Sequence, residues 1–282
     1  MKRVLGVVLA LFIVLNMAGC SPKGYPVVVG EIEISAPPKK VVAFSDNIAF
    51  AIADLGYEEL IVGATEGFIN SGKSGVANIS GQYEAELDVV AALKPDLAIS
   101  PVKLSAKAEQ MLNDAEIPYV VVATPENLEG LKTFYNTLAR VFVGEEKYIE
   151  TAEMFITKTE QELSALNTAN ASKDKTALIF VEEGLVATPD NLAGELVTAA
   201  GIKNAAQQFK NYEMPEEEIK KADPQVIICP KGLSDSIIKA PALNETTAVK
   251  NAAVYEVELA SLLYGTSGSV SVLKEITNYI SK

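Results

Sequence analysis

The feature that most constrains the fold is an alternation of short apolar runs with segments whose apolar residues have helical spacing. The run Val41–Phe44 predicts a buried strand, and Asn47–Leu55 predicts an amphipathic helix that Gly56 ends. Further strands are expected over 60–64, 97–99, 119–122, 177–181, 226–229 and 253–257, and further helices over 88–93, 106–115, 192–200 and 269–280. Strands that alternate with helices need crossover connections, so the sequence predicts an α/β fold with mainly parallel sheets.

One long segment interrupts this alternation. Residues 145–166 contain no Gly or Pro, and their apolar positions follow a 3.6-residue period, which predicts a single helix about 33 Å long. The simplest architecture is two α/β lobes joined by a single long α-helix. We expect an N-terminal lobe over 41–144, a bridging helix over 145–167 and a C-terminal lobe over 168–282.

A weak internal repeat supports two related lobes. When Pro95 is aligned with Pro224, each half shows an acidic residue, a short helix, Pro, an apolar strand and a second Pro. The acidic residues are Asp88 and Glu217, each expected at a helix start, where the helix dipole favours a negative charge by about 0.3–1 kcal/mol. The dipole explains each acidic residue by itself, but it does not explain why both halves share the arrangement.

The first twenty residues are expected to direct export. Lys2 and Arg3 precede the twelve-residue apolar run Val4–Leu15, which is too short to span a membrane and predicts a secretion signal. The ending Met17-Ala-Gly-Cys20 resembles the bacterial lipoprotein processing box. We therefore expect a signal peptide over 1–19, a lipidated Cys20 with a tether over 20–40, and an anchor on the extracytoplasmic face of the cell membrane, in the periplasm or at the cell surface. An ordinary signal peptide with an incidental Cys is the alternative.

Composition excludes several classes of function. The chain has 24 Lys+Arg against 37 Asp+Glu, so its net charge of -13 disfavours a nucleic-acid binder. It has no His, which excludes Ser-His-Asp and Cys-His catalysis and any His-ligated zinc or haem. Two Cys cannot build a disulfide framework, and Cys229 is expected to be buried in a strand. Without Lys2 and Arg3 the charge becomes -15, and Arg140 is the only Arg left.

A phosphate-binding loop pattern must be rejected. Residues 67–74 fit G-x-x-x-x-G-K-[ST], but that loop requires a helix to start at its Lys-Ser pair, and no helical stripe begins at Lys73. Residues 65–87 are instead expected to form a Gly-rich loop near a binding cleft.

Several segments carry a family resemblance that covers about residues 38–280. Ala92-Leu-Lys-Pro-Asp96 resembles the most recognisable segment of the bacterial substrate-binding proteins for ferric siderophores, haem and cobalamin. The other resembling segments, in the family's order, are 38–45, 55–63, 192–204, 222–227 and 249–255.

The resemblance implies a non-enzymatic component of an ABC importer that holds its ligand in a cleft between the two lobes. Its partners would be the permease subunits and, through them, their ATPase, and the protein would be a monomer without a cofactor. In this family one acidic residue of each lobe docks on the permease, and by position these residues are Asp88 and Glu217. The family usually has Glu at both positions, and Asp88 is one methylene shorter.

The cleft walls are expected on the loops that follow the strands. The candidates are Ser45, Asp46, Asn47, Phe68, Tyr83, Ser100, Lys103, Glu182, Glu183, Tyr212, Lys231 and Tyr264. No catalytic or metal-ligand set is predicted among them. Because the chain has no His, binding of free zinc or manganese is disfavoured. One Arg and an acidic total disfavour an anionic ferric catecholate, since Arg is the residue suited to clamping such anions.

The predicted ligand is therefore a metal chelate, a ferric siderophore or a cobamide, in neutral or cationic form. Three alternatives stay open. The first is a haem receptor of the same fold, with Tyr83, Tyr212 or Tyr264 on the iron. The second is a two-lobed α/β enzyme with Asp46 or Glu183 as acid or base, and the third is a surface adhesion or scaffold lipoprotein.

Overall fold

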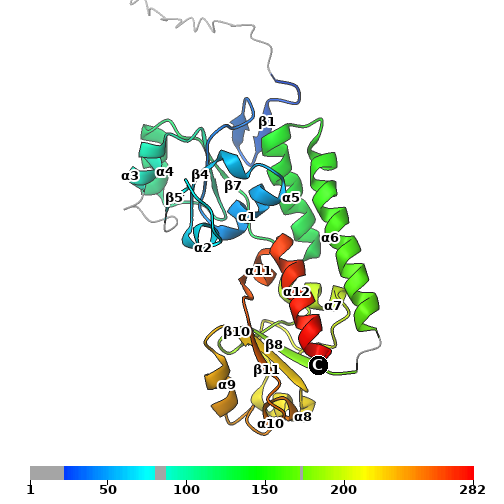
Figure 1. Ribbon diagram of the computed structural model, residues 1–282. Helices are drawn as coiled ribbons and strands as arrows, with labels where there is room; N and C mark the ends of the chain where they lie inside the picture. Colours follow the sequence, from blue (N-terminus) through cyan, green and yellow to red (C-terminus); the bar gives the residue numbers. More distant parts are fainter. Residues whose placement is uncertain (1–21, 80–86, 172–173) are drawn as a thin grey trace, which may run out of the picture.

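In a computed structural model, which describes residues 22–79, 87–171 and 174–282, the apolar runs form two separate sheets (Figure 1). The N-terminal sheet has the order β5-β4-β3-β6-β7, and every neighbouring pair is parallel. Its strands are β3 (Val41–Ala43), β4 (Ile61–Ala64), β5 (Ala77–Asn78), β6 (Leu97–Ser100) and β7 (Tyr119–Val121). Strands β3 and β6 are buried throughout, as expected for a parallel sheet that helices cover on both faces. The covering segments are α1 (Asp46–Asp54), η1 (Glu58–Leu60), α2 (Glu66–Asn70), α3 (Leu87–Leu93) and α4 (Ala106–Asp114).

The C-terminal sheet has the order β11-β10-β8-β9, in which only the short β9 is antiparallel to its neighbour. Its strands are β8 (Ala177–Glu182), β9 (Leu185–Val186), β10 (Val226–Pro230) and β11 (Val254–Val257). The helices of this lobe are α7 (Leu192–Ala199), α8 (Glu216–Ala222), α9 (Ser234–Lys239), α10 (Thr247–Lys250), α11 (Ala260–Tyr264) and α12 (Ser267–Ile280). The two-lobed α/β fold predicted from the sequence is confirmed.

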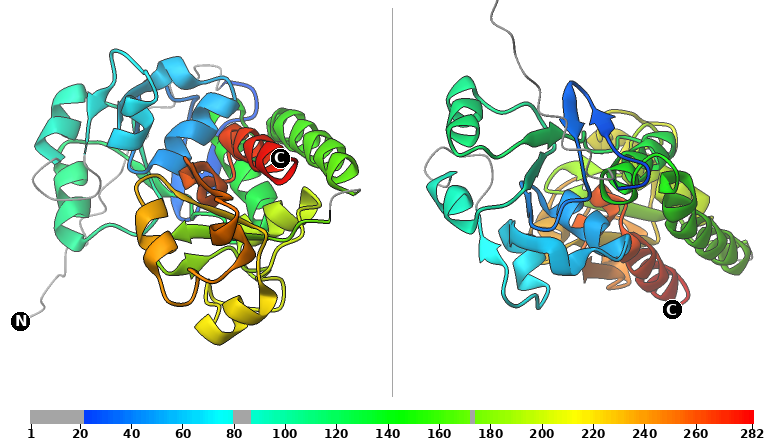
Figure 2. Two further views of the ribbon diagram at one scale, coloured as in Figure 1. Left: turned by 60° about the horizontal axis from the view of Figure 1, so that its bottom comes forward. Right: turned by 90° about the horizontal axis from the view of Figure 1, so that it is seen from above.

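The lobes are bridged by α6 (Tyr148–Asn170), which starts three residues later than the predicted helix and ends beyond it. It runs past both sheets and lies beside α12, to which Lys274 and Glu162 join it at 3.1 Å (Figures 1 and 2). A second helix, α5 (Leu128–Val143), was not expected and packs along α6 as a hairpin. Buried residues of both sheets, α5, α6 and α12 form one continuous core cluster, so the bridge belongs to the core. None of the described helices combines the length and hydropathy that crossing a membrane requires.

The segment before the first sheet differs from the expected tether. An antiparallel hairpin of β1 (Val27–Val29) and β2 (Ile32–Ile34) packs against α5, with Val27 and Val29 buried. The Tyr25 hydroxyl donates a hydrogen bond to the carbonyl of Val141 at 2.7 Å. This part of the 20–40 segment therefore belongs to the N-terminal lobe, because its apolar side chains find a partner on α5. Cys20 and the expected signal peptide lie outside the described residues.

Residues 67–74 do not have the structure of a phosphate-binding loop. Gly67 lies inside α2, so a helix precedes Lys73 instead of starting at it. The Lys73 ammonium forms an ion pair with Glu58 at 2.7 Å. The segment 65–87, expected to be a Gly-rich loop, contains α2 and the edge strand β5 in its described part, and residues 80–86 lie outside the described residues.

Cys229 is buried at the centre of the C-terminal sheet, on β10. Burial, followed by the negative charge of Glu256, raises its pKa to about 11. Because the thiolate is the reactive form, we expect protein that lacks residues 1–20 to show no reaction with a disulfide reagent while folded, and one thiol in denaturant. Rapid reaction of the folded protein would contradict the buried position.

Candidate functional site

Strand order points to one edge of each sheet as the place where a ligand is bound. In the N-terminal sheet, β4 and β5 lie on one side of β3, and β6 and β7 lie on its other side, so the direction of winding reverses between β3 and β6. In the C-terminal sheet it reverses in the same way between β8 and β10. In open α/β sheets, ligands bind outside the carboxyl ends of the strands at such reversal points. These ends carry Asp46 and Ser100 in the N-terminal lobe, and Glu182 and Lys231 in the C-terminal lobe. Ser100 is itself buried and bonded locally, its hydroxyl donating to the carbonyl of Val102 at 2.6 Å.

The lobes meet around Tyr264, the last residue of α11. Its hydroxyl lies 3.5 Å from a carboxylate oxygen of Asp46, and its ring stacks on Phe50 with the centroids 6.4 Å apart. Burial, followed by the charge and hydrogen bond of Asp46 and the charges of Glu258 and Glu182, raises the pKa of Tyr264 to about 12. Tyr264 therefore stays a neutral hydroxyl among carboxylates of both lobes.

A second tyrosine, Tyr212, occupies a similar electrostatic environment. Burial raises its pKa, and the charges of Asp190, Glu126 and Glu182 act in the same direction. Its backbone N–H donates to the hydroxyl of Thr188 at 3.1 Å, which fixes the chain there. We call the following set the interlobe site: Asp46, Glu126, Glu182, Asp190, Tyr212, Glu258 and Tyr264. Among the described residues, no group of three or more Cys, Asp or Glu is arranged to hold a metal ion.

Two of the predicted ligand residues have structural roles. The Asp46 carboxylate accepts hydrogen bonds from the Thr65 hydroxyl at 2.5 Å and from the backbone N–H of Phe68 at 2.8 Å. It thereby satisfies the N–H of Phe68 in the first turn of α2, a group that has no partner inside the helix. The prediction that Phe68 lines the cleft is wrong, because its side chain is 0% exposed and packs edge-on against Phe50 at 5.1 Å.

The remaining candidates fall into three groups. Ser45 donates to Asn47 at 2.6 Å, and the buried Asn47 amide donates to Thr124 at 3.3 Å, so this loop is held by its own bonds. Lys103 and Lys231 are exposed lysines, and each pairs with a glutamate at 3.8 Å, Glu109 and Glu258 respectively. Glu183 is exposed in the turn between β8 and β9 and lines a cavity of about 270 Å³ inside the C-terminal lobe. Tyr83 lies outside the described residues.

Several residues that contribute to the site were not foreseen. Phe50 and Asp54 follow Asp46 at intervals of four along α1, a spacing that places all three on one helix face. Asp54 accepts hydrogen bonds from the Tyr135 hydroxyl at 2.8 Å and from the backbone N–H of Ser267 at 2.9 Å. The pKa of Asp54 is raised overall. Burial raises it, and this effect exceeds the lowering by its hydrogen bonds to Ser267 and Tyr135 and by the charge of Lys158. The four-residue spacing was the signal available in the sequence.

The two predicted docking residues lie in equivalent places. Asp88 is in the first turn of α3 and Glu217 in the first turn of α8, and both are exposed. Each helix is followed by a left-handed residue before proline, Lys94 with φ 50° and Asp223 with φ 43°. The backbone hydrogen bonds after each proline also match. The N–H of Asp96 donates to the carbonyl of Lys40, directly before β3, and the N–H of Gln225 donates to the carbonyl of Thr176, directly before β8. The sequence repeat therefore corresponds to a structural repeat.

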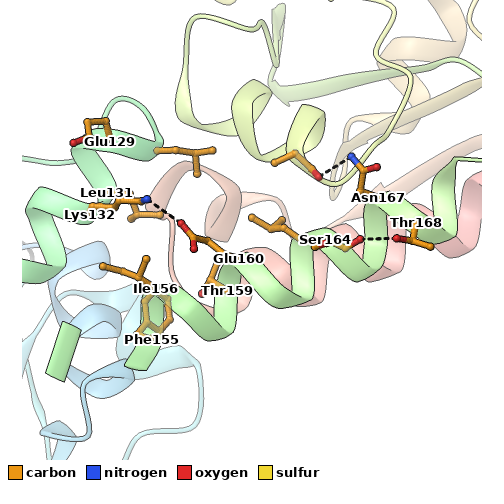
Figure 3. A pocket seen from close by; sticks show the side chains of 13 residues that line it. Glu129, Leu131, Lys132, Phe155, Ile156, Thr159, Glu160, Ser164, Asn167 and Thr168 are labelled. Carbon is orange, nitrogen blue, oxygen red and sulfur yellow. Dashed lines mark hydrogen bonds and ion pairs between the residues drawn. The ribbon is translucent and has the colours of Figure 1, made fainter. Parts of the chain in front are cut away.

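A cavity of about 480 Å³ lies between α5, α6 and α7, and no residue of the interlobe site lines it (Figure 3). Its walls are mostly apolar. An ion pair of Lys132 with Glu160 at 2.9 Å lies at one end, and a bond from Asn167 to the carbonyl of Ala199 at 3.2 Å lies at the other. None of the residues predicted to bind a ligand lines it.

Comparison with known proteins shows which family and fold this chain resembles. Residues 50–258 match the family model described as periplasmic binding protein. The ABC transporter substrate-binding lipoprotein YhfQ of Bacillus subtilis strain 168 is 24% identical, with 98% of this chain and 97% of that protein aligned. Petrobactin-binding protein YclQ of the same organism is 23% identical over 76% of this chain and 68% of its own length. Among solved structures, the periplasmic heme-binding protein RhuT of Roseiflexus sp. RS-1 has a TM-score of 0.69 and 20% identity, covering 86% of this chain and 97% of that chain.

Proposed function

The chain belongs to the periplasmic binding protein family, and from this premise we propose that it captures a metal chelate outside the cytoplasm and delivers it to an ABC importer. The observation that carries the proposal is the meeting of the two lobes at Tyr264. The residue lies beside the carboxyl ends of both parallel sheets, where Asp46 contacts it from the other lobe. Tyrosines supply flat, amphipathic surfaces on which a chelate rests.

The charge of the interlobe site indicates which chelates it accepts. Asp46, Glu182 and Glu258 act on Tyr264, while two lysines lie near the set: Lys231 pairs with Glu258, and the charge of Lys210 acts on Asp190. A neutral or cationic chelate is therefore favoured over an anionic one, because an anion entering this field would be repelled. We propose a ferric siderophore or a cobamide of that charge.

Haem is a weaker candidate on the same grounds. A tyrosine binds haem iron as the phenolate, and both burial and nearby carboxylates oppose ionisation of Tyr264 and Tyr212. Export and lipid attachment through Cys20 follow the sequence signal and the lipoprotein name of the YhfQ relative. The ligand would be released unchanged to the permease, without turnover.

Ligand capture predicts a thermal shift. Protein that lacks residues 1–20 should gain about 2.7 kcal/mol of stability when a true ligand is present at about one hundred times its dissociation constant. For a chain of this size that gain raises the melting temperature by roughly 5–10 °C. The panel should include cationic, neutral and anionic ferric siderophores, cobamides and haem, each scored by differential scanning fluorimetry and confirmed by calorimetry.

A matched pair of variants identifies the binding region. Glu182→Lys places a positive charge in the interlobe site, whereas Glu150→Lys makes the same change at an exposed position on α6. A cationic ligand should lose its thermal shift in the first variant and keep it in the second. The proposal fails if no chelate stabilises the protein, and the charge assignment fails if anionic chelates give the largest shift.

A further inference from the structure

The turn between α11 and α12 is held by residues of the opposite lobe. One face of α1 supplies Asp46 and Phe50 against Tyr264, and Asp54 against Ser267. On the other side, a side chain added at Gly265 would meet Leu131 of α5 at 2.5 Å, so the backbone of the turn lies directly against that helix. Gly265 also has a left-handed φ of 66°, which suits glycine. The turn from Tyr264 to Ser267 thus contacts the N-terminal lobe through α1 and α5, and Leu192 of α7 lies against it from its own lobe, while Ser267 itself is exposed.

Asp54 makes the polar contact that fixes this turn. The start of a helix leaves backbone N–H groups without partners and carries partial positive charge. Thr266 is the residue before α12, and its side chain makes no capping bond. The Asp54 carboxylate accepts the N–H of Ser267 instead, at 2.9 Å. The start of α12 is therefore capped from the other lobe, across 213 residues of sequence.

Asp54 is itself held in place. Its second bond comes from the Tyr135 hydroxyl at 2.8 Å, and the Tyr135 ring is fully buried and stacked on Phe155 of the bridging helix at 4.0 Å. The same hydroxyl lies 3.5 Å from the carbonyl of Gly265. The bridging helix, α5, α1 and the turn therefore form one connected unit that ends at the half-buried Tyr264.

We propose that Asp54 is a positioning residue that holds the α11–α12 turn and so presents Tyr264 to the ligand. The statement that Tyr264 contacts the ligand rests on the proposed function. The statement that Asp54 holds the turn in place does not. Asp54 touches no ligand and acts through Ser267.

The test of positioning needs no ligand. The chain has no Trp, so Tyr264→Trp gives a single fluorescent reporter at the end of the turn. In that background, Asp54→Ala should increase acrylamide quenching of the reporter about twofold and shift its emission to the red, because the turn opens to water. Asp54→Asn keeps an acceptor for Ser267 and should leave both signals close to those of the parent.

A second variant removes the hydrogen-bond donor, the N–H of Ser267, so that the test does not depend on correct folding of Asp54→Ala alone. Ser267→Pro deletes the donor N–H, yet proline is favoured at the first position of a helix, and Thr266 already has the extended backbone that precedes proline, with φ -97° and ψ 177°. Ala106→Pro is the matched control at the first position of α4, remote from the turn. Ser267→Pro should reproduce the signal of Asp54→Ala, and Ala106→Pro should not.

The binding arm uses native Tyr264 and whichever chelate the thermal panel identifies. Asp54→Ala and Ser267→Pro should weaken its affinity about tenfold, and Asp54→Asn should restore it to within about threefold. Unchanged quenching in both Asp54→Ala and Ser267→Pro overturns the positioning role. Altered quenching with no chelate bound by any variant refutes the proposed function alone, and altered quenching with unchanged affinity shows that Tyr264 does not contact the ligand.

Discussion

Glu217→Arg should reduce uptake of the ligand about a hundredfold or more while its binding to the purified protein stays unchanged. Glu217 is exposed in the first turn of α8, in the place that Asp88 occupies in the first turn of α3. Two carboxylates held at fixed separation by the core suit a partner with two basic pockets. A like charge placed opposite such a pocket costs several kcal/mol, and about 2.7 kcal/mol is already a hundredfold.

The design separates docking from general effects of charge. Glu150→Arg makes the same substitution at an exposed first-turn position of α6 and should leave uptake intact. Asp88→Arg should impair uptake in the same way as Glu217→Arg, and Asp88→Glu, which restores the residue usual in the family, should support uptake at least as well as Asp88. Uptake is measured with labelled chelate in cells that carry the importer, and affinity by calorimetry. If Glu217→Arg loses ligand affinity instead, Glu217 belongs to the ligand site or to the fold.

The strands and most helices could be predicted because each is encoded locally. Val41–Phe44 and the runs over 97–100 and 226–229 are buried on both faces, so their sequences are continuously apolar and easy to recognise. The repeat around Pro95 and Pro224 was also recognisable, since the same backbone bends recur before both prolines. Helix α5 was not predicted, although Asn127 caps its start and Gly144 ends it, because its apolar stripe directly precedes the longer stripe of α6 in the sequence.

The candidate site was harder to predict because its residues meet only through tertiary contacts. Asp46 and Tyr264 are 218 positions apart, and no local pattern links them. Phe68 followed a predicted strand and so resembled a wall of the cleft, but α2 turns its ring inward onto Phe50. The strand ends themselves were correctly located, since topology alone brings the carboxyl ends of parallel strands to one edge. Which side chains at that edge satisfy the fold and which remain for a ligand depends on contacts that the sequence does not state.

Gly194→Ala should lower the free energy of unfolding by about 3 kcal/mol, and the melting temperature by roughly 6–12 °C. Gly194 lies in the first turn of α7, and a methyl group there would overlap the carbonyl of Thr188, a backbone atom that cannot rotate away. The chain offers a close control in Gly130, which occupies the same position of α5. In both helices an Asn cap, Asn191 or Asn127, accepts the N–H of this glycine, at 3.0 Å and 2.7 Å respectively.

Gly130→Ala should be neutral or slightly stabilising, because its new methyl group would meet the side-chain oxygen of Asn127 at 3.3 Å and Pro125 at 3.7 Å, with no backbone carbonyl in its way, and alanine favours the helix. The two variants therefore share the helix position and the Asn cap, and they differ in burial and in what the added methyl group meets. Thr188 also accepts the N–H of Tyr212, so the backbone shift that Gly194→Ala demands should reach the interlobe site and weaken ligand binding as well. Urea unfolding of both variants, with and without ligand, measures each effect. Equal stability of the two would show that α7 moves away from Thr188 at little cost, and that Tyr212 is not tied to this contact.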